Sequence, residues 1–237
     1  MKNKTMICLA GILLFLSLNT VAQKTAPILP GAYQTAQYLP LLKNKRVGLF
    51  TNHTATVGKK HLIDTLLASG IQIQKVFTPE HGLRGTADAG EKTKDGIDEA
   101  TGVKIVSLYG KKYGPSEADL ADVDVLLFDI QDVGTRFYTY ISSLQYYMEA
   151  AWANNKPLVI LDRPNPNGHY VDGPVLEKPF SSFVGKQSIP TVYGMTIGEY
   201  ATMLVGEKWL TAPTDSSINK AGSPIQFTVI GCKNYDH

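Results

Sequence analysis

The feature that most constrains the fold is an almost unbroken apolar run at residues 124–130, which leads directly into a polar segment. A strand that is apolar on both faces is typical of the centre of a parallel sheet, because helices cover both sides of such a sheet. Other short runs rich in β-branched residues predict further strands at 46–50, 71–77, 104–108, 157–161 and 225–230.

Helical patterns alternate with these strands. Apolar residues repeat at helical spacing over 60–69 and most clearly over 140–152. Two capping boxes predict helix starts, one at Ser116 with Asp119 and one at Thr196 with Glu199. Strands that alternate with helices indicate an α/β fold with a mostly parallel sheet flanked by helices.

The N-terminus has the pattern of a signal peptide. Two lysines precede an apolar run, and Thr20, Val21 and Ala22 supply small residues for cleavage before Gln23. We therefore expect residues 1–22 to be removed and the protein to be exported, to the periplasm or the medium. Cleavage takes away two of the 23 basic residues and none of the 21 acidic ones. This balance argues against nucleic acid or a stable membrane association, and the single remaining cysteine, Cys232, argues against an intrachain disulfide.

Polar, glycine-containing segments follow the predicted strands. In open α/β sheets, ligands bind beyond the carboxyl ends of the strands, where several such segments converge. Two long segments, 82–101 and 162–190, lack an apolar period and are typical of functional loops. The segments that we expect to form one rim are 51–54, 78–85, 109–110, 129–136 and 162–168.

Several kinds of site are disfavoured by missing motifs. The chain has no G-x-G-x-x-G after its first strand and no P-loop, so a nucleotide site lacks its phosphate cradle. It has no G-x-S-x-G nucleophile elbow and no H-x-x-x-H ligand spacing. We therefore expect neither a metal nor a cofactor.

Carboxylate chemistry remains, and Glu80 is the first candidate. It follows a predicted strand directly, behind a proline, which presents its side chain at the rim. Glycoside cleavage needs such a group to protonate the leaving oxygen, and usually a second group at the opposite side of the sugar. Asp129 and Asp132 are candidates for the second group, although participation by the substrate's acetamido group would remove the need for either.

Other rim residues are candidates for binding a substrate. Tyr138 could stack on a sugar ring. The full set that we predict to bind substrate is Asn52, His53, His81, Arg84, Arg136, Tyr138, Asp162, Arg163 and Asn165.

Six segments in order resemble one known family, the exo-acting β-N-acetylmuramidases, formerly a bacterial family of unknown function. The resemblance extends over about residues 40–210. Its segments are GLFTNHT (48–54), FTPEHGLRG (77–85), SLYG (107–110), FDIQDVGTRFYTY (128–140), LDRPNPNG (161–168) and YGMTIGE (193–199).

The resemblance implies a Rossmann-like catalytic domain and a smaller C-terminal domain that share a cleft. It implies release of N-acetylmuramic acid from the non-reducing end of peptidoglycan fragments without a cofactor, with the glutamate at Glu80 as the catalytic residue. We accordingly expect a linker at 23–39, the Rossmann-like domain at 40–222, and only the start of the C-terminal domain at 223–237.

N-acetylmuramic acid carries a lactyl carboxylate, which arginine binds well. Arg84 or Arg136 is therefore expected to bind the lactyl group. Two other functions stay open on the residues alone: an exported module that binds muropeptides without turnover, and a metal-dependent cell-wall hydrolase.

Overall fold

A seven-stranded sheet organises the residues that the computed structural model describes, which are 26–85, 94–211 and 224–237. The strand order is β5-β6-β4-β1-β7-β8-β9, and all neighbours pair in parallel except β5 with β6. This confirms the predicted α/β fold with a mostly parallel sheet. The strands are β1 Arg46–Thr51, β4 Gln72–Thr78, β5 Gly96–Ile97, β6 Lys104–Ser107, β7 Val125–Asp129, β8 Leu158–Leu161 and β9 Phe227–Ile230.

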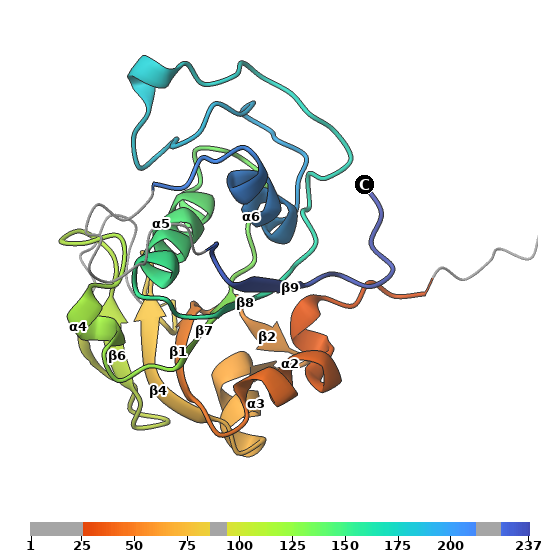
Figure 1. The fold of residues 1–237 in the computed structure, drawn as a ribbon. Helices are drawn as coiled ribbons and strands as arrows, with labels where there is room; N and C mark the ends of the chain where they lie inside the picture. The colour runs from red at the N-terminus through yellow and green to blue at the C-terminus, as the bar shows by residue number, and fades with distance from the viewer. Residues whose placement is uncertain (1–25, 86–93, 212–223) are drawn as a thin grey trace, which may run out of the picture.

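Helices cover both faces of this sheet (Figure 1). From β1 the chain adds β4 and β6 on one side, then crosses back to add β7, β8 and β9 on the other. Because parallel crossovers are right-handed, this reversal puts α3 on one face and α5 and α6 on the opposite face. Two buried cores result, one on each face. The helices are α2 Thr35–Leu42, α3 Leu62–Ala68, α4 Glu117–Leu120, α5 Tyr140–Ala153 and α6 Ile197–Gly206, with 3-10 turns η1 Gly31–Tyr33 and η2 Lys178–Phe180.

Both predicted capping boxes are present. Ser116 accepts the backbone N–H of Asp119 at the start of α4, and Thr196 accepts that of Glu199 at the start of α6. The prediction of a helix from Lys60 was wrong at its start, because Lys60–His61 forms strand β3 in a hairpin with β2 (Thr56–Val57). His61 then caps α3 by accepting the N–H of Ile63 through Nδ1 at 3.2 Å.

The predicted linker at 23–39 is wrong for its described C-terminal part. Residues 31–33 form η1, and α2 begins at Thr35. Tyr38 is fully buried in the core on the α3 face, and its hydroxyl donates to the Ala32 carbonyl at 2.9 Å. Burial of this aromatic side chain holds the segment on the sheet. The predicted signal peptide, 1–22, lies outside the described residues.

The predicted boundary at 222/223 is also wrong, because β9 belongs to the same sheet. It pairs in parallel with β8, from Leu158 opposite Phe227 to Leu161 opposite Ile230. The segment after β9 then bridges to the N-terminal segment through Leu29 and Lys233. Residues 224–237 therefore belong to the Rossmann-like domain.

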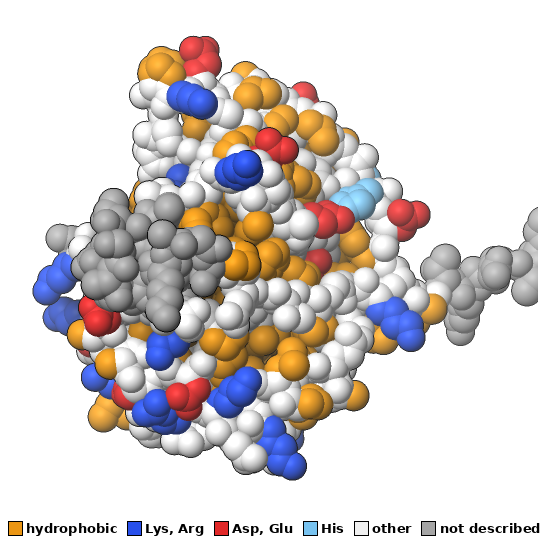
Figure 2. Space-filling view, viewed as in Figure 1, with side chains coloured by type: hydrophobic (Ala, Val, Ile, Leu, Met, Phe, Trp, Pro, Cys, Tyr) orange, Lys and Arg blue, Asp and Glu red, His pale blue; other side chains and the backbone are white. Residues whose placement is uncertain are grey.

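The segment between β8 and α6 runs far above the two helices α5 and α6 before it returns (Figure 1). Acidic and basic side chains are interspersed on the face in Figure 2 and form no patch of a single sign. Among the described residues, no helix has the length and apolar character that a membrane span needs.

Candidate active site

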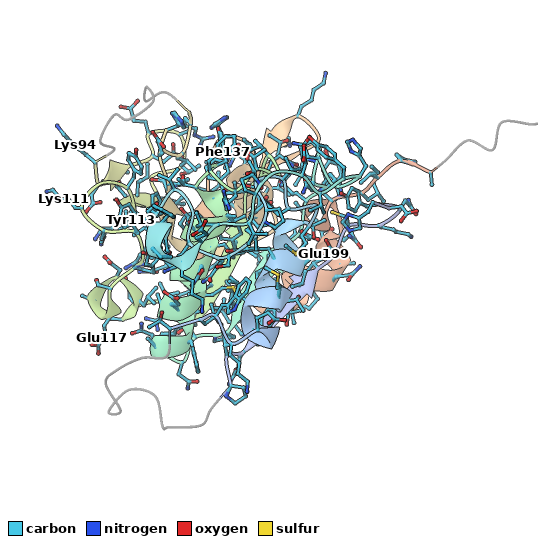
Figure 3. The ribbon with its side chains drawn as sticks, turned by 90° about the horizontal axis from the view of Figure 1, so that it is seen from above. Lys94, Lys111, Tyr113, Glu117, Phe137 and Glu199 are labelled. Atoms are coloured by element: carbon cyan, nitrogen blue, oxygen red, sulfur yellow. The ribbon has the colours of Figure 1, made fainter. Side chains whose placement is uncertain are left out.

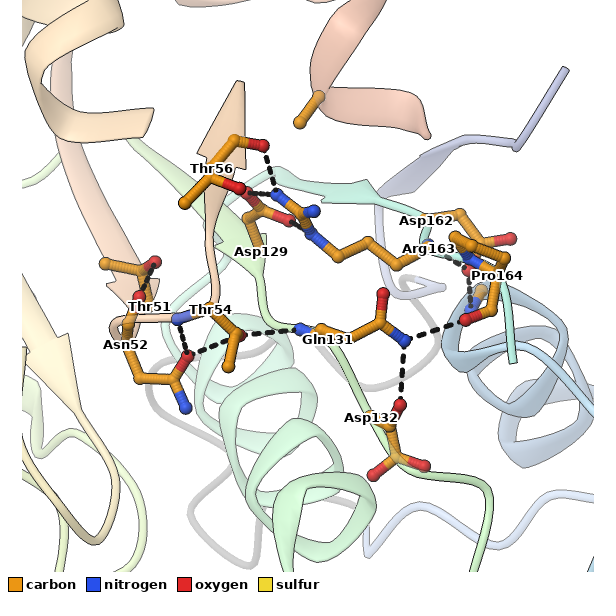
Figure 4. Close-up of polar contacts among 12 residues, drawn as sticks. Thr51, Asn52, Thr54, Thr56, Asp129, Gln131, Asp132, Asp162, Arg163 and Pro164 are labelled. Atoms are coloured by element: carbon orange, nitrogen blue, oxygen red, sulfur yellow. Dashed lines mark hydrogen bonds and ion pairs between the residues drawn. The ribbon is translucent and has the colours of Figure 1, made fainter. Parts of the chain in front are cut away.

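The strand order reverses between β1 and β7. These adjacent strands start the two halves of the sheet, and such a reversal is where open α/β sheets bind ligands. The loops 51–54 and 129–132 meet at the carboxyl ends of these strands, and we call them the β1/β7 region. The backbone N–H of Gln131 donates to Thr54 Oγ1 at 3.0 Å, which ties the two loops together (Figure 4).

Asn52 is fully buried in the β1/β7 region. Its Oδ1 accepts both the N–H and the hydroxyl of Thr54, at 3.0 and 2.6 Å, and its Nδ2 donates to the Tyr140 hydroxyl at 2.8 Å. His61 Nε2 approaches the Asn52 carbonyl at 2.8 Å. The side chain that we predicted to bind substrate thus shapes the loop after β1, and its role toward a ligand stays a prediction.

Asp129 and Arg163 form a buried ion pair. Arg163 donates through Nε and Nη2 to the two carboxylate oxygens at 2.6 and 2.8 Å, and through Nη2 to the Thr56 carbonyl at 3.1 Å (Figure 4). The side chain of Asp129 is fully buried and that of Arg163 is 6% exposed. This bidentate pairing joins two residues that we predicted separately, one as catalytic and one as substrate-binding.

Asp132 is buried beside Tyr193. Its Oδ2 accepts the backbone N–H of Gly134 at 2.8 Å and the Tyr193 hydroxyl, whereas its Oδ1 meets no donor among the described residues. Burial raises the pKa of Asp132, although both hydrogen bonds to Oδ2 act in the opposite direction. The protonated form of this carboxyl is therefore favoured more than in water.

Asp162 and Asn165 attach the loop after β8 to the start of α6. Asp162 Oδ1 accepts the Gly198 N–H at 2.8 Å, and Oδ2 accepts the Thr196 hydroxyl at 2.8 Å. Asn165 Nδ2 donates to the Met195 carbonyl at 2.8 Å. In these contacts both residues organise the backbone around α6.

Glu80 lies in a different setting, on the wall of a cavity of about 320 Å³. We call it the Glu80 cavity; it is lined by Glu80, His81, Phe137, Tyr138, Thr139 and Tyr140. Glu80 is half-buried directly after β4, and the chain turns at once through His81 and Gly82, each with φ of 70°. The turn leaves the carboxyl on the cavity wall instead of in the sheet.

Three aromatic side chains belong to the same lining. Phe137 is 57% exposed and Tyr138 is 38% exposed, whereas Tyr140 is buried. The rings of Tyr138 and Tyr140 meet edge to face with centroids 4.9 Å apart. A carboxyl beside exposed aromatic rings is an arrangement that can bind a sugar and protonate its glycosidic oxygen.

The two arginines expected at the lactyl group both contact protein groups. Arg84 forms an ion pair with Asp98 at 2.7 Å and a longer one with Asp64 at 3.9 Å. Arg136 Nη1 donates to the carbonyls of Ile189 and Pro174 at 2.6 and 3.2 Å. Neither lines the Glu80 cavity, and their role in lactyl binding stays a prediction.

A comparison of families decides what kind of protein this is. The family described as "Exo-beta-N-acetylmuramidase NamZ, N-terminal" matches residues 47–237. The chain belongs to the NamZ family. A curated relative, the peptidoglycan beta-N-acetylmuramidase NamZ of Bacillus subtilis strain 168, is 50% identical over 169 residues, which are 70% of this chain and 41% of the relative.

Two solved structures share the fold of this NamZ-family chain. Both are DUF1343 family proteins of Bacteroides fragilis NCTC 9343, solved at 1.30 and 1.65 Å resolution. Each has a TM-score of 0.75, with identities of 47% and 38% over 89% and 88% of this chain. They are covered over 53% and 51% of their own length. The chain therefore spans about half the length of these relatives.

His53 connects two loops of this NamZ-family domain. It is exposed after β1, and its ring packs against Gly85, where an added Cβ would lie 2.8 Å from the His53 Cγ. Gly85 also has φ of 70°. Both the positive φ and the close His53 ring therefore favour glycine at this position. The predicted binding residues His53 and His81 thus lie in the loops after β1 and β4, and only His81 lines the Glu80 cavity.

Tyr109 and Tyr193 are residues of interest that the sequence reasoning missed as site residues. Tyr193 donates to Asp132, and burial and the neighbouring Glu80 carboxyl raise the pKa of the Tyr109 phenol. Tyr109 lies in the rim segment 109–110 and in one of the segments that carry the family resemblance, and this position was the signal in the sequence that could have found it.

A second cavity, of about 400 Å³, lies around Glu199 and His237, which are 2.9 Å apart. It shares no lining residue with the Glu80 cavity, and Figure 3 labels Glu199 and Phe137 at different places in the molecule. Among the described residues, no group of three or more His, Cys, Asp or Glu side chains is arranged to hold a metal ion.

Proposed function

We propose that the protein carrying this chain is an exo-β-N-acetylmuramidase that releases N-acetylmuramic acid from the non-reducing end of peptidoglycan fragments. The observation that carries the proposal is the position of Glu80, a half-buried carboxyl on a cavity wall with exposed aromatic rings. The B. subtilis relative, which is 50% identical, is named as a peptidoglycan beta-N-acetylmuramidase.

In this proposal Glu80 is the general acid. Its proton passes to the glycosidic oxygen as the bond from that oxygen to the anomeric carbon breaks. Water then completes the hydrolysis at the anomeric carbon, and Glu80 regains a proton.

The second group is the substrate's own acetamido oxygen in this proposal. Asp129 is bound to Arg163 on both oxygens, and Asp132 is buried beside Tyr193. Neither aspartate lines the Glu80 cavity. Participation by the acetamido group needs no second carboxylate, which fits this arrangement.

The decisive experiment compares the intact protein with its Glu80→Gln variant on a chromogenic N-acetylmuraminide. We expect turnover to fall at least about 100-fold, because glutamine keeps the shape and loses the proton. Glu117→Gln is the matched control, since Glu117 is exposed on α4, at the edge of the molecule in Figure 3. Turnover that survives in Glu80→Gln would reject Glu80 as the acid.

The same assay separates two other functions. A muropeptide-binding module would bind the substrate without turning it over. A metal-dependent hydrolase would lose activity when a chelator is added, whereas a hydrolase that works through Glu80 alone would keep it.

We further propose that the protein is exported. The lysines and the apolar run before Ala22 support this. Sequencing the N-terminus of the protein recovered from the periplasm or the medium should give Gln23 as the first residue, and retention of Met1 in the cytoplasm would contradict export.

A further inference from the structure

Tyr109 lies beside Glu80 because of the register of two neighbouring strands. β4 and β6 pair in parallel, and their last paired residues are Thr78 and Ser107. The backbone N–H of Leu108 then donates to the Thr78 carbonyl at 2.9 Å, which extends the pairing by one step. Glu80 and Tyr109 each follow two residues after the last pair, so both side chains emerge at the same level of the sheet edge.

This register brings the phenol of Tyr109 near the carboxyl of Glu80. Burial and the neighbouring Glu80 carboxyl, as hydrogen-bond acceptor and as charge, raise the pKa of Tyr109. The phenol therefore stays protonated near neutral pH and can donate to the carboxylate.

The loop that carries Tyr109 is fixed at several points. The Tyr109 N–H lies 3.3 Å from Ser107 Oγ, and Lys112 forms an ion pair with Asp119 at 2.5 Å. The ring of Tyr113 stacks on Phe183 with centroids 4.0 Å apart, and Phe183 belongs to the long segment before α6. These contacts hold the phenol of Tyr109 in place before any ligand binds.

We propose that Tyr109 is a positioning residue for Glu80, holding its carboxyl toward the Glu80 cavity and donating to the carboxylate left after proton transfer. The proposal rests on the proposed function. During the step the proton moves from Glu80 to the leaving oxygen, and Tyr109 keeps its own proton throughout. Its hydrogen bond strengthens as negative charge develops on Glu80, which lowers the barrier.

The kinetic test replaces the phenol and keeps the ring, in Tyr109→Phe of the intact protein. We expect kcat to fall about 10- to 100-fold with KM nearly unchanged, as for the loss of a hydrogen bond to a charged group. The alkaline limb of the pH–rate profile should move to higher pH, because the ionised acid has lost a donor.

Tyr113→Phe is the matched control. It removes a phenol from the same loop and keeps the ring that stacks on Phe183. This control should keep the kcat and the pH profile of the parent. Unchanged kinetics in Tyr109→Phe would overturn the proposal. So would an equal loss in both variants without a shift of the profile, since that would show a structural role only.

A measurement without turnover separates this proposal from the proposed function. In the intact protein with carbon-labelled tyrosine, NMR can follow the Tyr109 resonance, assigned by its absence in Tyr109→Phe. We expect Tyr109 to titrate at lower pH in Glu80→Gln than in the parent. An unchanged titration would overturn the contact with Glu80. A parent that titrates as expected and cleaves no muraminide would instead reject the proposed function.

Discussion

The β1/β7 region and the Glu80 cavity both lie at the carboxyl ends of parallel strands, yet their polar side chains have different partners. In the β1/β7 region, Asp129 binds Arg163 and Asn52 binds Thr54, so these two side chains are matched within the protein. In the cavity, Glu80 shares a wall with exposed Phe137. The position of a side chain at the carboxyl end of a strand therefore shows where a site can form. The hydrogen-bond and ion-pair partners of that side chain show whether it is used within the protein or can face a ligand.

The largest effect that tests this comparison is the loss of stability in Asp129→Ala. Arg163 would stay buried without its counter-charge, which costs about 3–5 kcal/mol in the free energy of unfolding. Urea denaturation measures this, with Glu207→Ala as control because Glu207 is exposed after α6. A loss below about 1 kcal/mol would show that the pair is not structural. The double replacement Asp129→Leu with Arg163→Met should recover much of the stability, since no charge is then buried.

A smaller effect is expected at Asp132, and it depends on pH. Burial raises the pKa of Asp132 above its value in the unfolded chain. The contribution of this group to stability is therefore full below the unfolded value of about 3.9 and is lost as pH rises through the folded value. Asp132→Asn should be more stable than the parent at neutral pH and close to it in acid.

Urea denaturation of both proteins at acidic and neutral pH measures this difference. A stability difference that is the same at both pH values would contradict it. The same variant tests the second catalytic group: because Asp132 does not line the Glu80 cavity, its kcat should change far less than that of Glu80→Gln.

The smallest expected effect on stability is that of Phe137→Ala, at the cavity wall. The ring is 57% exposed, so its loss should change the free energy of unfolding by about 0.5 kcal/mol or less. Its loss should raise KM about fivefold, because aromatic contacts contribute about 1 kcal/mol. Steady-state kinetics measures the change in KM, and urea denaturation measures the change in the free energy of unfolding. If stability falls and KM does not change, Phe137 belongs to the core instead of the substrate surface.

The fold could be predicted where local signals are strong. The unbroken apolar run gave β7, and the capping boxes at Ser116 and Thr196 gave the starts of α4 and α6. Helix α2 was missed because it contains Pro40 and has no side-chain cap. Its position on the sheet depends instead on the burial of Tyr38, a tertiary contact. β9 was predicted as a strand, yet its membership of this sheet depends on pairing with β8, which is far away in the sequence.

The sequence predicts that the site is a rim of loops. It does not predict which side chains of the rim bind to one another. Arg163 could have paired with the adjacent Asp162, whereas the structure pairs it with Asp129, 34 residues away. Asp162 instead binds the start of α6. Which partner each of these charged side chains binds depends on distances in the folded chain. Tyr109 was missed for the same reason, because its relation to Glu80 comes from the register of two strands.

That register has a consequence for how chains of this fold can change length. Glu80 and Tyr109 each stand two residues after Thr78 and Ser107, the last pair of β4 and β6. Substitutions within either strand leave this offset intact, whereas one inserted or deleted residue in 79–80 or 108–109 would move one side chain and not the other. We expect insertions and deletions in related chains to be absent from these two dipeptides and to be tolerated beyond Gly85 and Gly110.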